Sequence, residues 1–594
     1  MAEKKRIVSG LFNLTFLGII VAAMILINII SSFWYERIDM TSDHRYSLAE
    51  GTVDYLKKSE NFKSRLSLNI YLAGNLPAEL SYFRNAVEDK LKEFKQYAGD
   101  RIEYQFVDPN EGTEEEQREL QDQLWAKGEG ILPMTILYSK DGEQSQLLLW
   151  PGATIDYGGS TVSTVQLLPG SKSGQPFQLK GMGDKIQNSI NNLEYILISA
   201  IRRATQETKK RVAFLQGHDE FTFAQTQRVR ALLSPYYNVV DVSLNDSIHA
   251  LDNVDGLIIA RPREVFSDKD LYLIDQFVMK GGRLMCFLEQ LYLPQDTLMR
   301  YGQSNTVRYE TRLDRLLFDY GIKVNDNYVI DAQCLPLQVP LANKPVIPWF
   351  YYVLATPTSH PISRNVEPVS LKYCNEIQFV GNDPQIALTP ILTSSTNATA
   401  TGLAPLVSLA MPLNYGTNPE LVPNPESENN KKCLAGLAEG HFTSYFKNRL
   451  VEEFAKNPDA GYSDQSVKEG KVIVVGNAQF IANQYDSMPK KIGTGFMYKP
   501  KALNDLQFSE DLMRIQFPHF FGNQEFFQNL TDYMMGDNSV LDIRSRQIDI
   551  NRIDAQKVKE SANFYKIINL LIPVGIIVVL AFLMHYLRRR KFAR

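Results

Sequence analysis

Two long uncharged segments at the ends of the chain constrain its fold most. Residues 7–30 read IVSGLFNLTFLGIIVAAMILINII, and residues 567–587 form a second apolar span that contains Pro573. A helix needs about 20 apolar residues to cross the hydrocarbon core of a membrane. The proline in the second span is compatible with such a helix, because neighbouring helices can satisfy the carbonyl that a proline leaves free. We expect a transmembrane helix at each end, in preference to two buried core helices or a cleaved signal peptide.

The charges beside these spans predict their orientation. Lys4, Lys5 and Arg6 precede the first span, and residues 588–591 follow the second with three arginines and a lysine. Because cytoplasmic flanks carry the excess of basic residues, both termini are expected in the cytoplasm and residues 36–566 on the opposite face. Small or polar positions can bring membrane helices close together, and the candidates here are Gly10, Gly18, Asn28, Asn569 and Gly575.

Charge and cysteine content exclude some functions. The net charge is -4 although basic residues cluster at both termini, so the interior is more acidic still. An acidic interior without a basic stripe repels a phosphate backbone, which argues against a nucleic-acid partner. The four cysteines fit a domain held by its hydrophobic core, with at most an incidental disulfide such as Cys334 to Cys374.

The first exterior domain is expected to be a small α/β layer. Ser47 and Glu50 fit a capping box that would start a helix. A strand, helix, strand unit follows, and its two strands should be parallel. It consists of the strand LSLNIYL, a helix from Pro77 to about Tyr97 and the strand RIEYQFVDP. An acidic helix near residues 113–127 and a hairpin around Asp141 follow. Residues 151–181, rich in Gly, Ser and Pro, are expected to form a connection.

The second exterior domain shows a clear alternation of strands and helices. RVAFLQ, NVVDVSL, DGLIIARP and RLMCFLEQ are apolar runs separated by helical segments, and KVIVVGNAQF is a later strand of the same kind. Buried parallel strands have this character. The first membrane helix is predicted within residues 1–35, and the second, with the basic tail, within residues 564–594. The first domain with its connection is predicted to span residues 36–180. The second domain is predicted to span residues 181–334 and 471–563, interrupted at residues 335–470 by a Pro-rich insertion or β-rich subdomain.

The loop QGHDE raises the question of a binding site. Ligands of open α/β sheets bind beyond the carboxyl ends of the strands, where the sequence places residues 217–220, 261–263, 289–290, 477 and 479. The candidate ligand-binding residues are His218, Asp219, Glu220, Arg261 and Asn477. The structural alternative is that these are only the polar turn residues with which such strands end.

Catalytic, metal and nucleotide sites are not indicated. The sequence has no G-x-S-x-G elbow, and Cys286 has the apolar neighbours of a buried thiol. No histidine pair has metal-ligand spacing, so we expect no metal and no cofactor; a metal at His218 is the weaker alternative to a hydrogen-bonding turn residue. There is no phosphate cradle, so any energy must come through a partner.

Several motifs in order resemble one family. RYSLAEGTVDYL, FVDP, LQGHDE, IIARP with FVMKGGRLM, VIVVGNAQF and FFQNLTDYMMGDNSVLDIRSR stand between the two spans. Together they resemble GldG, the auxiliary, so-called substrate-binding subunit of the gliding-motility ABC transporter of Bacteroidota. Its members more often have glycine where this chain has Asp219, and a side chain there limits the approach of a ligand to the backbone.

The resemblance implies a periplasmic body anchored in the inner membrane by two helices. It implies a multi-spanning ABC permease as partner, a cytoplasmic ATPase reached through it, and a second domain similar to flavodoxin and glutamine-amidotransferase folds. The leading hypothesis is a non-enzymatic subunit that acts in assembly, force or signal transmission. The alternatives are a solute receptor for a glycan or peptide at the candidate residues, and a tethered hydrolase, which would need a nucleophile and a base in contact.

Overall fold

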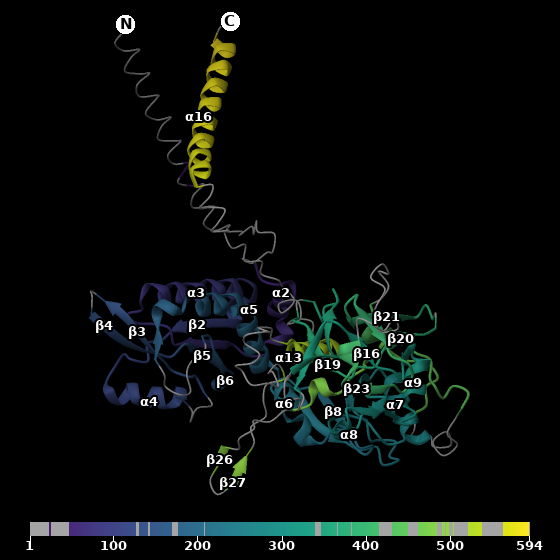
Figure 1. Cartoon of the computed structure of the whole chain (residues 1–594). Coiled ribbons are helices and arrows are strands. Elements are labelled where there is room, and N and C mark those ends of the chain that lie inside the picture. The colour runs from purple at the N-terminus through teal and green to yellow at the C-terminus, as the bar shows by residue number, and fades with distance from the viewer. Residues whose placement is uncertain are drawn as a thin grey trace, which may run out of the picture. The chain divides into compact units, whose positions relative to one another are not determined.

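A computed structural model describes most of the chain between the terminal spans (Figure 1). It describes residues 47–125, 130–140, 143–168, 176–206, 208–338, 346–364, 366–381, 383–414, 431–449, 461–483, 490–492, 495–497, 521–536 and 562–592, with Ala23, Met24, Leu26 and Leu503. The chain divides into two compact units, Met1–Asp39 with Tyr46–Arg546 and Met40–Arg45 with Gln547–Arg594. The positions Gly10, Gly18 and Asn28, with most of the first span, lie outside the described residues.

A four-stranded sheet is the centre of the first α/β region. Its order is β2-β1-β5-β6, with bounds β1 Leu66–Ile70, β2 Ile102–Phe106, β5 Gly152–Tyr157 and β6 Ser160–Gln166. β1 and β2 are parallel and joined through α3 (Ala78–Ala98), which confirms the predicted strand, helix, strand unit. The buried residues of α3 recur every three or four positions and form one apolar face, namely Leu80, Phe83, Val87, Leu91, Phe94 and Ala98.

The strands β5 and β6 lie where the sequence predicts a connection. β5 pairs antiparallel with β1 and with β6, so much of residues 151–181 completes the sheet, and that prediction is wrong. Glycine and serine content favours a loop, but GATIDY and STVSTVQ carry the β-branched residues that suit a strand. Gly152 has a packing role, because a Cβ there would lie 2.6 Å from the carbonyl oxygen of Val165.

Three helices and a small sheet complete this region. The bounds are α2 Glu50–Lys57, α4 Glu114–Trp125, α5 Gly183–Thr205, β3 Met134–Lys140, β4 Glu143–Leu149 and β7 Phe177–Gln178. The sheet order is β4-β3-β7, and β3 and β4 pair antiparallel with Lys140 opposite Glu143. This register confirms the predicted hairpin, whose turn residues lie outside the described residues.

The start of α2 depends on a distant carboxylate. Ser47 fits a capping box, but the N-cap residue is Ala49, and no side chain of the N-cap caps the helix, so that prediction is wrong. Glu194 Oε1 on α5 accepts from the Ala49 N–H at 2.6 Å and from the Thr52 hydroxyl at 2.8 Å. A buried carboxylate far along the chain therefore satisfies the helix terminus that the local sequence was expected to cap.

Replacing Glu194 with alanine tests this contact. Glu194→Ala is expected to lower the free energy of unfolding by about 2 kcal/mol, because a buried amide and a hydroxyl lose their acceptor. Glu194→Gln keeps one acceptor oxygen and should lose less. Urea unfolding of the full chain measures the change, with the exposed Glu103→Ala as control. A Glu194→Ala protein as stable as the parent would show that the contact contributes nothing.

Five parallel strands organise the second α/β region. Their order in the sheet is β9-β8-β10-β11-β25. The bounds are β8 Arg211–Leu215, β9 Asn238–Val242, β10 Gly256–Ala260, β11 Arg283–Phe287 and β25 Gly470–Val475. After β8 the chain forms β9 on one side and then β10 on the other, so the strand order reverses between β8 and β10.

Helices cover both faces of these strands. α6 (Phe223–Leu233) and α13 (Asn523–Met534) share a core with Phe214 and Met285, whereas α7 (Asp268–Met279) and α9 (Leu313–Asp319) share a core with Leu215 and Cys286. Successive residues of a strand point to opposite faces. Because both faces are covered, both sets of side chains must be apolar, which accounts for the continuous apolar runs.

The sheet continues past β25 with antiparallel strands. The order β25-β24-β21-β18-β17 uses β24 Cys433–Gly440, β21 Ile386–Thr393, β18 Val346–Pro357 and β17 Cys334–Gln338, with β15 Ile322–Val324, β19 Val369–Lys372 and β20 Ile377–Phe379 beside them. The described strands between residues 335 and 470 therefore extend the parallel sheet itself. All four cysteines are free thiols, so Cys334 and Cys374 do not form the disulfide that was considered.

Short elements fill the loops of this region. They are β12 Leu291–Tyr292, α8 Gln295–Tyr301, β13 Gln303–Asn305, β14 Val307–Arg308, β16 Val329–Asp331, β22 Ala398–Ala400, β23 Leu406–Ser408, α10 Met411–Asn414, β26 Lys490–Ile492 and β27 Gly495–Met497. β12 pairs with β14, and β13 pairs with β23. The Tyr309 N–H donates to the Gln290 carbonyl at 2.9 Å, which keeps the β12 and β14 pair beside the carboxyl end of β11.

The helix α16 (Ala562–Phe592) is described in the second unit and contains Pro573. Asn569 and Gly575, two predicted packing positions, lie on it. Within the described ranges, no helix combines the length and the apolar character needed to cross a membrane. The two membrane anchors stay predictions from the sequence.

Candidate functional site

The predicted binding residues follow the ends of three parallel strands. His218, Asp219 and Glu220 follow β8, Arg261 follows β10, and Asn477 follows β25. The loops after β8 and β10 meet, because the amides of Arg263 and Glu264 donate to the carbonyl of His218 at 2.8 and 3.1 Å. They meet where the strand order reverses, which is the usual place for a ligand in an open α/β sheet.

His218 is a buried connector between this loop and α7. Its side chain stacks on Phe266 with ring centroids 3.8 Å apart. Nε2 lies 3.4 Å from Asp270 Oδ2, and Nδ1 lies 3.4 Å from Glu220 Oε1. The Glu220 carboxylate also accepts from the His218 N–H at 2.7 Å. His218 and Glu220 therefore act inside the fold, and neither is a prominent surface ligand.

The surrounding carboxylates decide the charge of His218. Burial disfavours the imidazolium, but Asp270 and Glu220 outweigh burial and raise the pKa of His218 to about 9. Burial also opposes ionisation of Asp270, yet hydrogen bonds from His218 and Ser267 lower the pKa of its carboxyl. A protonated His218 at neutral pH is a poor metal ligand, because coordination needs the neutral ring. Among the described residues no group of three metal-ligating side chains occurs.

The backbone of the loop after β8 is sharply turned. Gly217 has φ 128°, and Asp219 has φ 55°, a left-handed conformation that glycine adopts more easily. The exposed Asp219 carboxylate lies 3.5 Å from Arg263 Nη1. Such an exposed ion pair contributes little to stability. Asp219 is therefore available at the surface beside the arginines.

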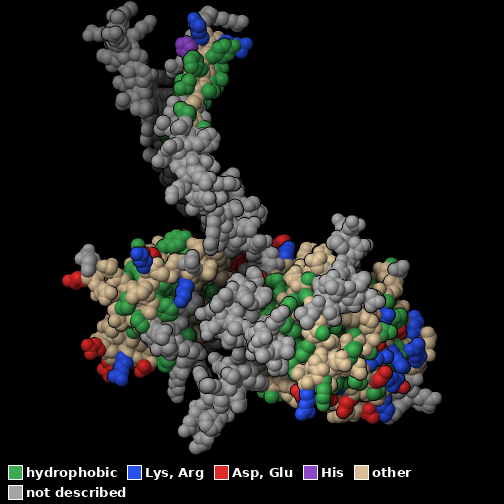
Figure 2. All heavy atoms as spheres, viewed as in Figure 1, with side chains coloured by type: hydrophobic (Ala, Val, Ile, Leu, Met, Phe, Trp, Pro, Cys, Tyr) green, Lys and Arg blue, Asp and Glu red, His purple; other side chains and the backbone are tan. Residues whose placement is uncertain are grey.

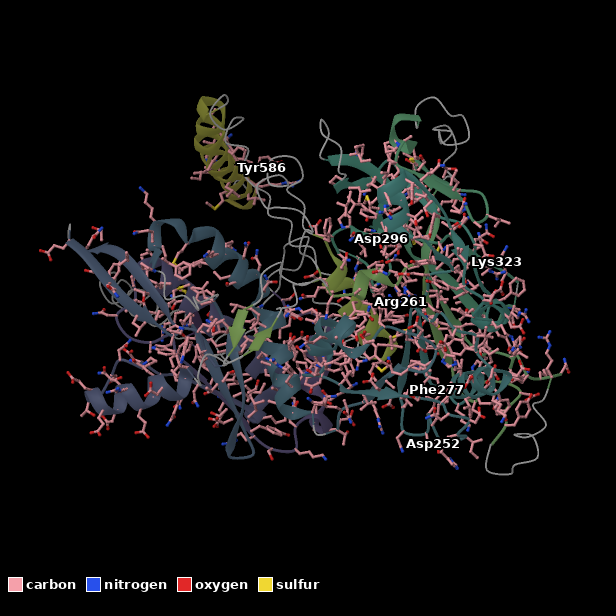
Figure 3. All side chains as sticks on the ribbon, turned by 60° about the horizontal axis from the view of Figure 1, so that its bottom comes forward. Asp252, Arg261, Phe277, Asp296, Lys323 and Tyr586 are labelled. Carbon is pink, nitrogen blue, oxygen red and sulfur yellow. The ribbon has the colours of Figure 1, made fainter. Side chains whose placement is uncertain are left out.

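Arg261 is the predicted residue with the most unusual setting. Only 9% of it is exposed, and its guanidinium lies 4.1 Å from the centroid of Phe221 (Arg261 is labelled in Figure 3). Burial lowers the pKa of Arg261, and the charge of Arg263 lowers it further. Its Nε has no hydrogen-bond partner, and it forms no ion pair, among the described residues. Buried charges normally have an ion pair or hydrogen bonds, whereas Arg261 has the Phe221 ring and the charges of Glu289 and Asp219 nearby.

Four residues near Arg261 were not among the chosen binding residues. The Arg263 guanidinium lies 5.9 Å from the Tyr292 ring and 5.6 Å from the Tyr309 ring. Glu289 follows β11. Burial raises the pKa of its carboxyl, although a hydrogen bond with Gln479 and the charges of the two arginines act to lower it. The sequence placed Arg263 and Glu289 at this sheet edge, but no sequence signal indicated the tyrosines, which the β12 and β14 pair brings there.

Asn477 does not join this cluster. It is fully buried, its side-chain amide donates to the Lys372 carbonyl, and its Oδ1 accepts from the Phe480 N–H at 3.0 Å. The preceding Gly476 leaves no room for a side chain, since a Cβ would lie 2.2 Å from the Asn375 carbonyl oxygen. VGNAQF is therefore a tight internal junction between β25 and the antiparallel strands.

Cys286 is equally internal. Its side chain is fully buried on β11, and burial raises the pKa of the thiol far above its usual range. The reactive form of cysteine is the thiolate. In this position Cys286 stays protonated and packs as a small apolar side chain.

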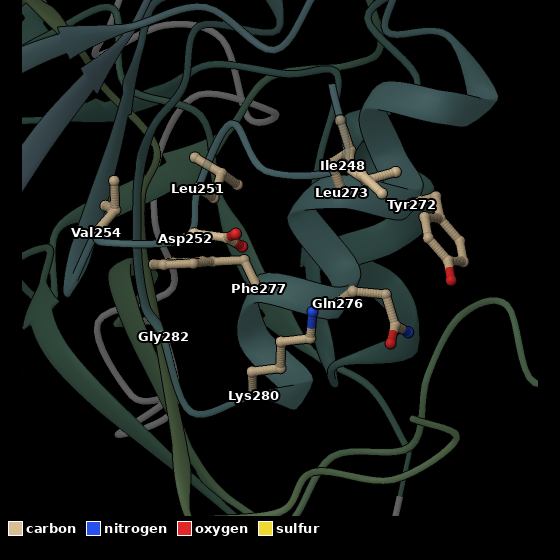
Figure 4. Close-up of a pocket in the computed structure, with 10 residues that line it drawn as sticks. All are labelled: Ile248, Leu251, Asp252, Val254, Tyr272, Leu273, Gln276, Phe277, Lys280 and Gly282. Carbon is tan, nitrogen blue, oxygen red and sulfur yellow. The ribbon is translucent and has the colours of Figure 1, made fainter. Parts of the chain in front are cut away.

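A separate cavity of about 220 Å³ lies near the C-terminal end of α7 (Figure 4). Polar and apolar atoms line it in similar measure, and the lining residues are Ile248, Leu251, Asp252, Val254, Tyr272, Leu273, Gln276, Phe277, Lys280 and Gly282. The α7 residues that line this cavity begin at Tyr272, two positions after Asp270, and neither Asp270 nor His218 is among the lining residues. Sequence reasoning missed it, because its residues read as an ordinary helix face.

Comparisons with known proteins identify the class. Residues 209–509 match the family described as ABC-type uncharacterized transport system, and residues 42–156 match a domain of unknown function, DUF7088. The first match covers half of the chain, so the chain belongs to this family of ABC transport system auxiliary proteins. Membership supports a non-catalytic role related to ABC transport and association with a transporter complex.

The other comparisons add little. Among solved structures, the chain is similar to the one titled "mmIFT52 N-terminal domain", with 13% sequence identity, coverage of 55% of this chain and 97% of that chain, and a TM-score of 0.29. A likeness this weak carries no argument about function. No curated protein matches the chain.

Proposed function

We propose that this chain is the non-catalytic periplasmic subunit of an ABC transporter complex that serves gliding motility. Two terminal membrane helices hold it to a multi-spanning permease in the inner membrane, with both termini in the cytoplasm. Through the permease it works with a cytoplasmic ATPase, in assembly or in transmitting force or a signal. The observation that carries the proposal is the transport-family match over residues 209–509. The two uncharged spans and the ordered motifs that resemble GldG support the finer part.

The side chains of α16 support an anchoring role. Large apolar residues on this helix are exposed in the described chain, as the hydrophobic side chains along α16 in Figure 2 illustrate. They include Leu571, Ile572, Ile577, Val578, Val579, Leu580, Phe582, Leu583, Met584, Tyr586 and Leu587. A surface of this kind is stable when lipid or another protein covers it.

Co-purification tests the proposal. The full chain, tagged and extracted with detergent, is expected to retain a permease and an ATPase. A variant with Val579→Arg and Phe582→Arg should lose both partners, because arginine in an apolar interface is costly. Phe223→Arg, at an exposed site on α6, should keep them. Cells that lack the chain should fail to glide. Recovery of a partner-free monomer from gentle extraction, or normal gliding without the chain, would refute the proposal.

One observation favours a second function, that of a solute receptor. Arg261, Arg263 and Glu289 place buried polar atoms without partners at the sheet edge, and those atoms are Arg261 Nε, Arg263 Nε and Glu289 Oε1 among the described residues. Native proteins leave few buried polar groups unpaired. A ligand that supplies both an acceptor and a donor would satisfy all three.

A further inference from the structure

We define the edge cluster as Arg261, Arg263, Glu289, Tyr292 and Tyr309. The unpaired polar atoms of this cluster indicate which groups a ligand would need to carry. Its unpaired donors are two guanidinium Nε groups, and its unpaired acceptor is one carboxylate oxygen. The only ion pair of either arginine within the described residues is the exposed one between Arg263 and Asp219. An incoming carboxylate would supply the oxygens that guanidinium groups bind best. An N–H or O–H beside that carboxylate would satisfy Glu289.

The aromatic members of the edge cluster form one wall. The rings of Tyr292 and Tyr309 lie 6.1 Å apart, and the Arg263 guanidinium is within 6 Å of both. Tyr292 is 44% exposed, so part of its ring is available to a ligand. A guanidinium held by two rings has little freedom left to lose when it binds an anion.

An exposed apolar strip continues from this wall. Tyr292 is paired directly with Val307, which is 56% exposed. Asn305, two residues before Val307, is paired with Leu406, which is 54% exposed. Leu403, three residues before Leu406, is also exposed. The register thus places Tyr292, Val307 and Leu406 along two adjoining strand pairs, and we call these three residues with Leu403 the apolar strip.

We propose that the edge cluster and the apolar strip bind an extended peptide segment of another protein that carries one carboxylate followed by apolar side chains. The carboxylate is held by Arg261 and Arg263, a backbone N–H of the peptide donates to Glu289, and the apolar side chains lie on the strip. This inference rests on the receptor function proposed above and names its ligand class. It is independent of which transporter subunit anchors the chain.

The strip distinguishes a peptide from an acidic sugar. Tyrosine rings suit the face of a sugar ring as well as a peptide, and arginine binds a uronate as well as a glutamate. Val307, Leu403 and Leu406 have no polar group to offer the hydroxyls of a glycan, and burying apolar surface against apolar side chains is favourable. Charge and apolar area together therefore favour a peptide.

Direct binding tests the inference with the full chain in detergent. The probe is a set of short capped peptides in which one glutamate is flanked by leucines, labelled for fluorescence anisotropy; the matched control peptides carry glutamine in place of glutamate. We expect saturable binding of the glutamate peptides and at least about tenfold weaker binding of the glutamine peptides. Rising salt should weaken the first and leave the second nearly unchanged.

Protein variants assign the contact. Arg261→Gln and Arg263→Gln should each weaken glutamate-peptide binding by at least about tenfold, and Tyr292→Ala should weaken both peptide sets. Arg228→Gln is the matched control, because Arg228 also has a buried Nε without a partner in the described chain but lies on α6. Tyr82→Ala, an exposed tyrosine on α3, controls for ring loss. Unchanged thermal unfolding shows that each variant is folded.

Three outcomes would overturn the inference. They are no saturable binding by any glutamate peptide, binding that survives both arginine variants, and binding of polygalacturonate fragments in place of peptides. The last outcome would assign the edge cluster to an acidic saccharide. Co-purification of the permease is a separate measurement. Failure of peptide binding would therefore not affect the subunit proposal, and failure of co-purification would not affect the proposed ligand class.

Discussion

Replacing Asp275 with alanine is expected to cause the largest loss of stability of any single change considered for this chain. Asp275 lies on α7 and is fully buried. Its carboxylate accepts from the Tyr320 hydroxyl at 2.8 Å, the Ser444 hydroxyl at 2.6 Å, the Tyr445 N–H at 3.0 Å and the Gln276 side-chain amide at 2.9 Å. Three segments that are far apart in the sequence therefore meet at one side chain.

The expected cost follows from what the change leaves behind. Asp275→Ala removes the acceptor and leaves these donors unpaired in the core, which should lower the free energy of unfolding by about 3–5 kcal/mol. Burial raises the pKa of Asp275 although its four donors oppose the shift, so Asp275→Asn, which keeps one acceptor oxygen and no charge, should cost less.

Urea unfolding of the full chain measures this prediction. Asp296→Ala is the matched control, because Asp296, which is labelled in Figure 3, is an exposed residue of α8; it should change stability by no more than about 0.5 kcal/mol. If Asp275→Ala changed stability as little as Asp296→Ala, the hydrogen bonds described for Asp275 would not hold this region together.

Raising the pH through 9 should remove stability that depends on His218. Its pKa is about 9 in the folded chain against 6.5 for a free imidazole. The folded state therefore holds its proton more tightly, and the contribution is fully present below pH 6.5 and is lost as the pH rises through about 9. Because both contacts of the ring with the carboxylates are long, at 3.4 Å, we expect about 1–2 kcal/mol, less than the full shift would give.

The variant His218→Gln isolates this contribution. It should be less stable than the parent near neutral pH and should lose less stability between pH 6.5 and 9. His249→Gln is the control, because His249 is an exposed histidine paired with Asp252, and its loss should leave the pH dependence of the parent intact. Identical pH profiles for the parent and His218→Gln would show that the Asp270 and Glu220 contacts do not hold the proton.

The candidate site divides into parts that the sequence could and could not predict. The motif QGHDE correctly marks the turn after β8, and IIARP marks the turn after β10. The sequence does not show that His218 and Glu220 face inward, because Asp270 and Phe266, on and just before α7, complete their surroundings. It also cannot show that the Asn477 side-chain amide is hydrogen-bonded to the Lys372 carbonyl, whereas Arg261 Nε has no hydrogen-bond partner among the described residues.

The sequence by itself determined the alternation of strands and helices, because the spacing of apolar residues and the choice of turn residues are local signals that extend over only a few positions. It thereby located the parallel unit of β1 and β2, the five strands of the second region and the sheet edge where Arg261 lies. Only the tertiary structure decided that β5 joins β1, that Glu194 caps α2 and that Tyr292 and Tyr309 stand beside Arg263. These contacts join residues far apart along the chain, and their free energy depends on burial and geometry that exist only after the sheet has closed.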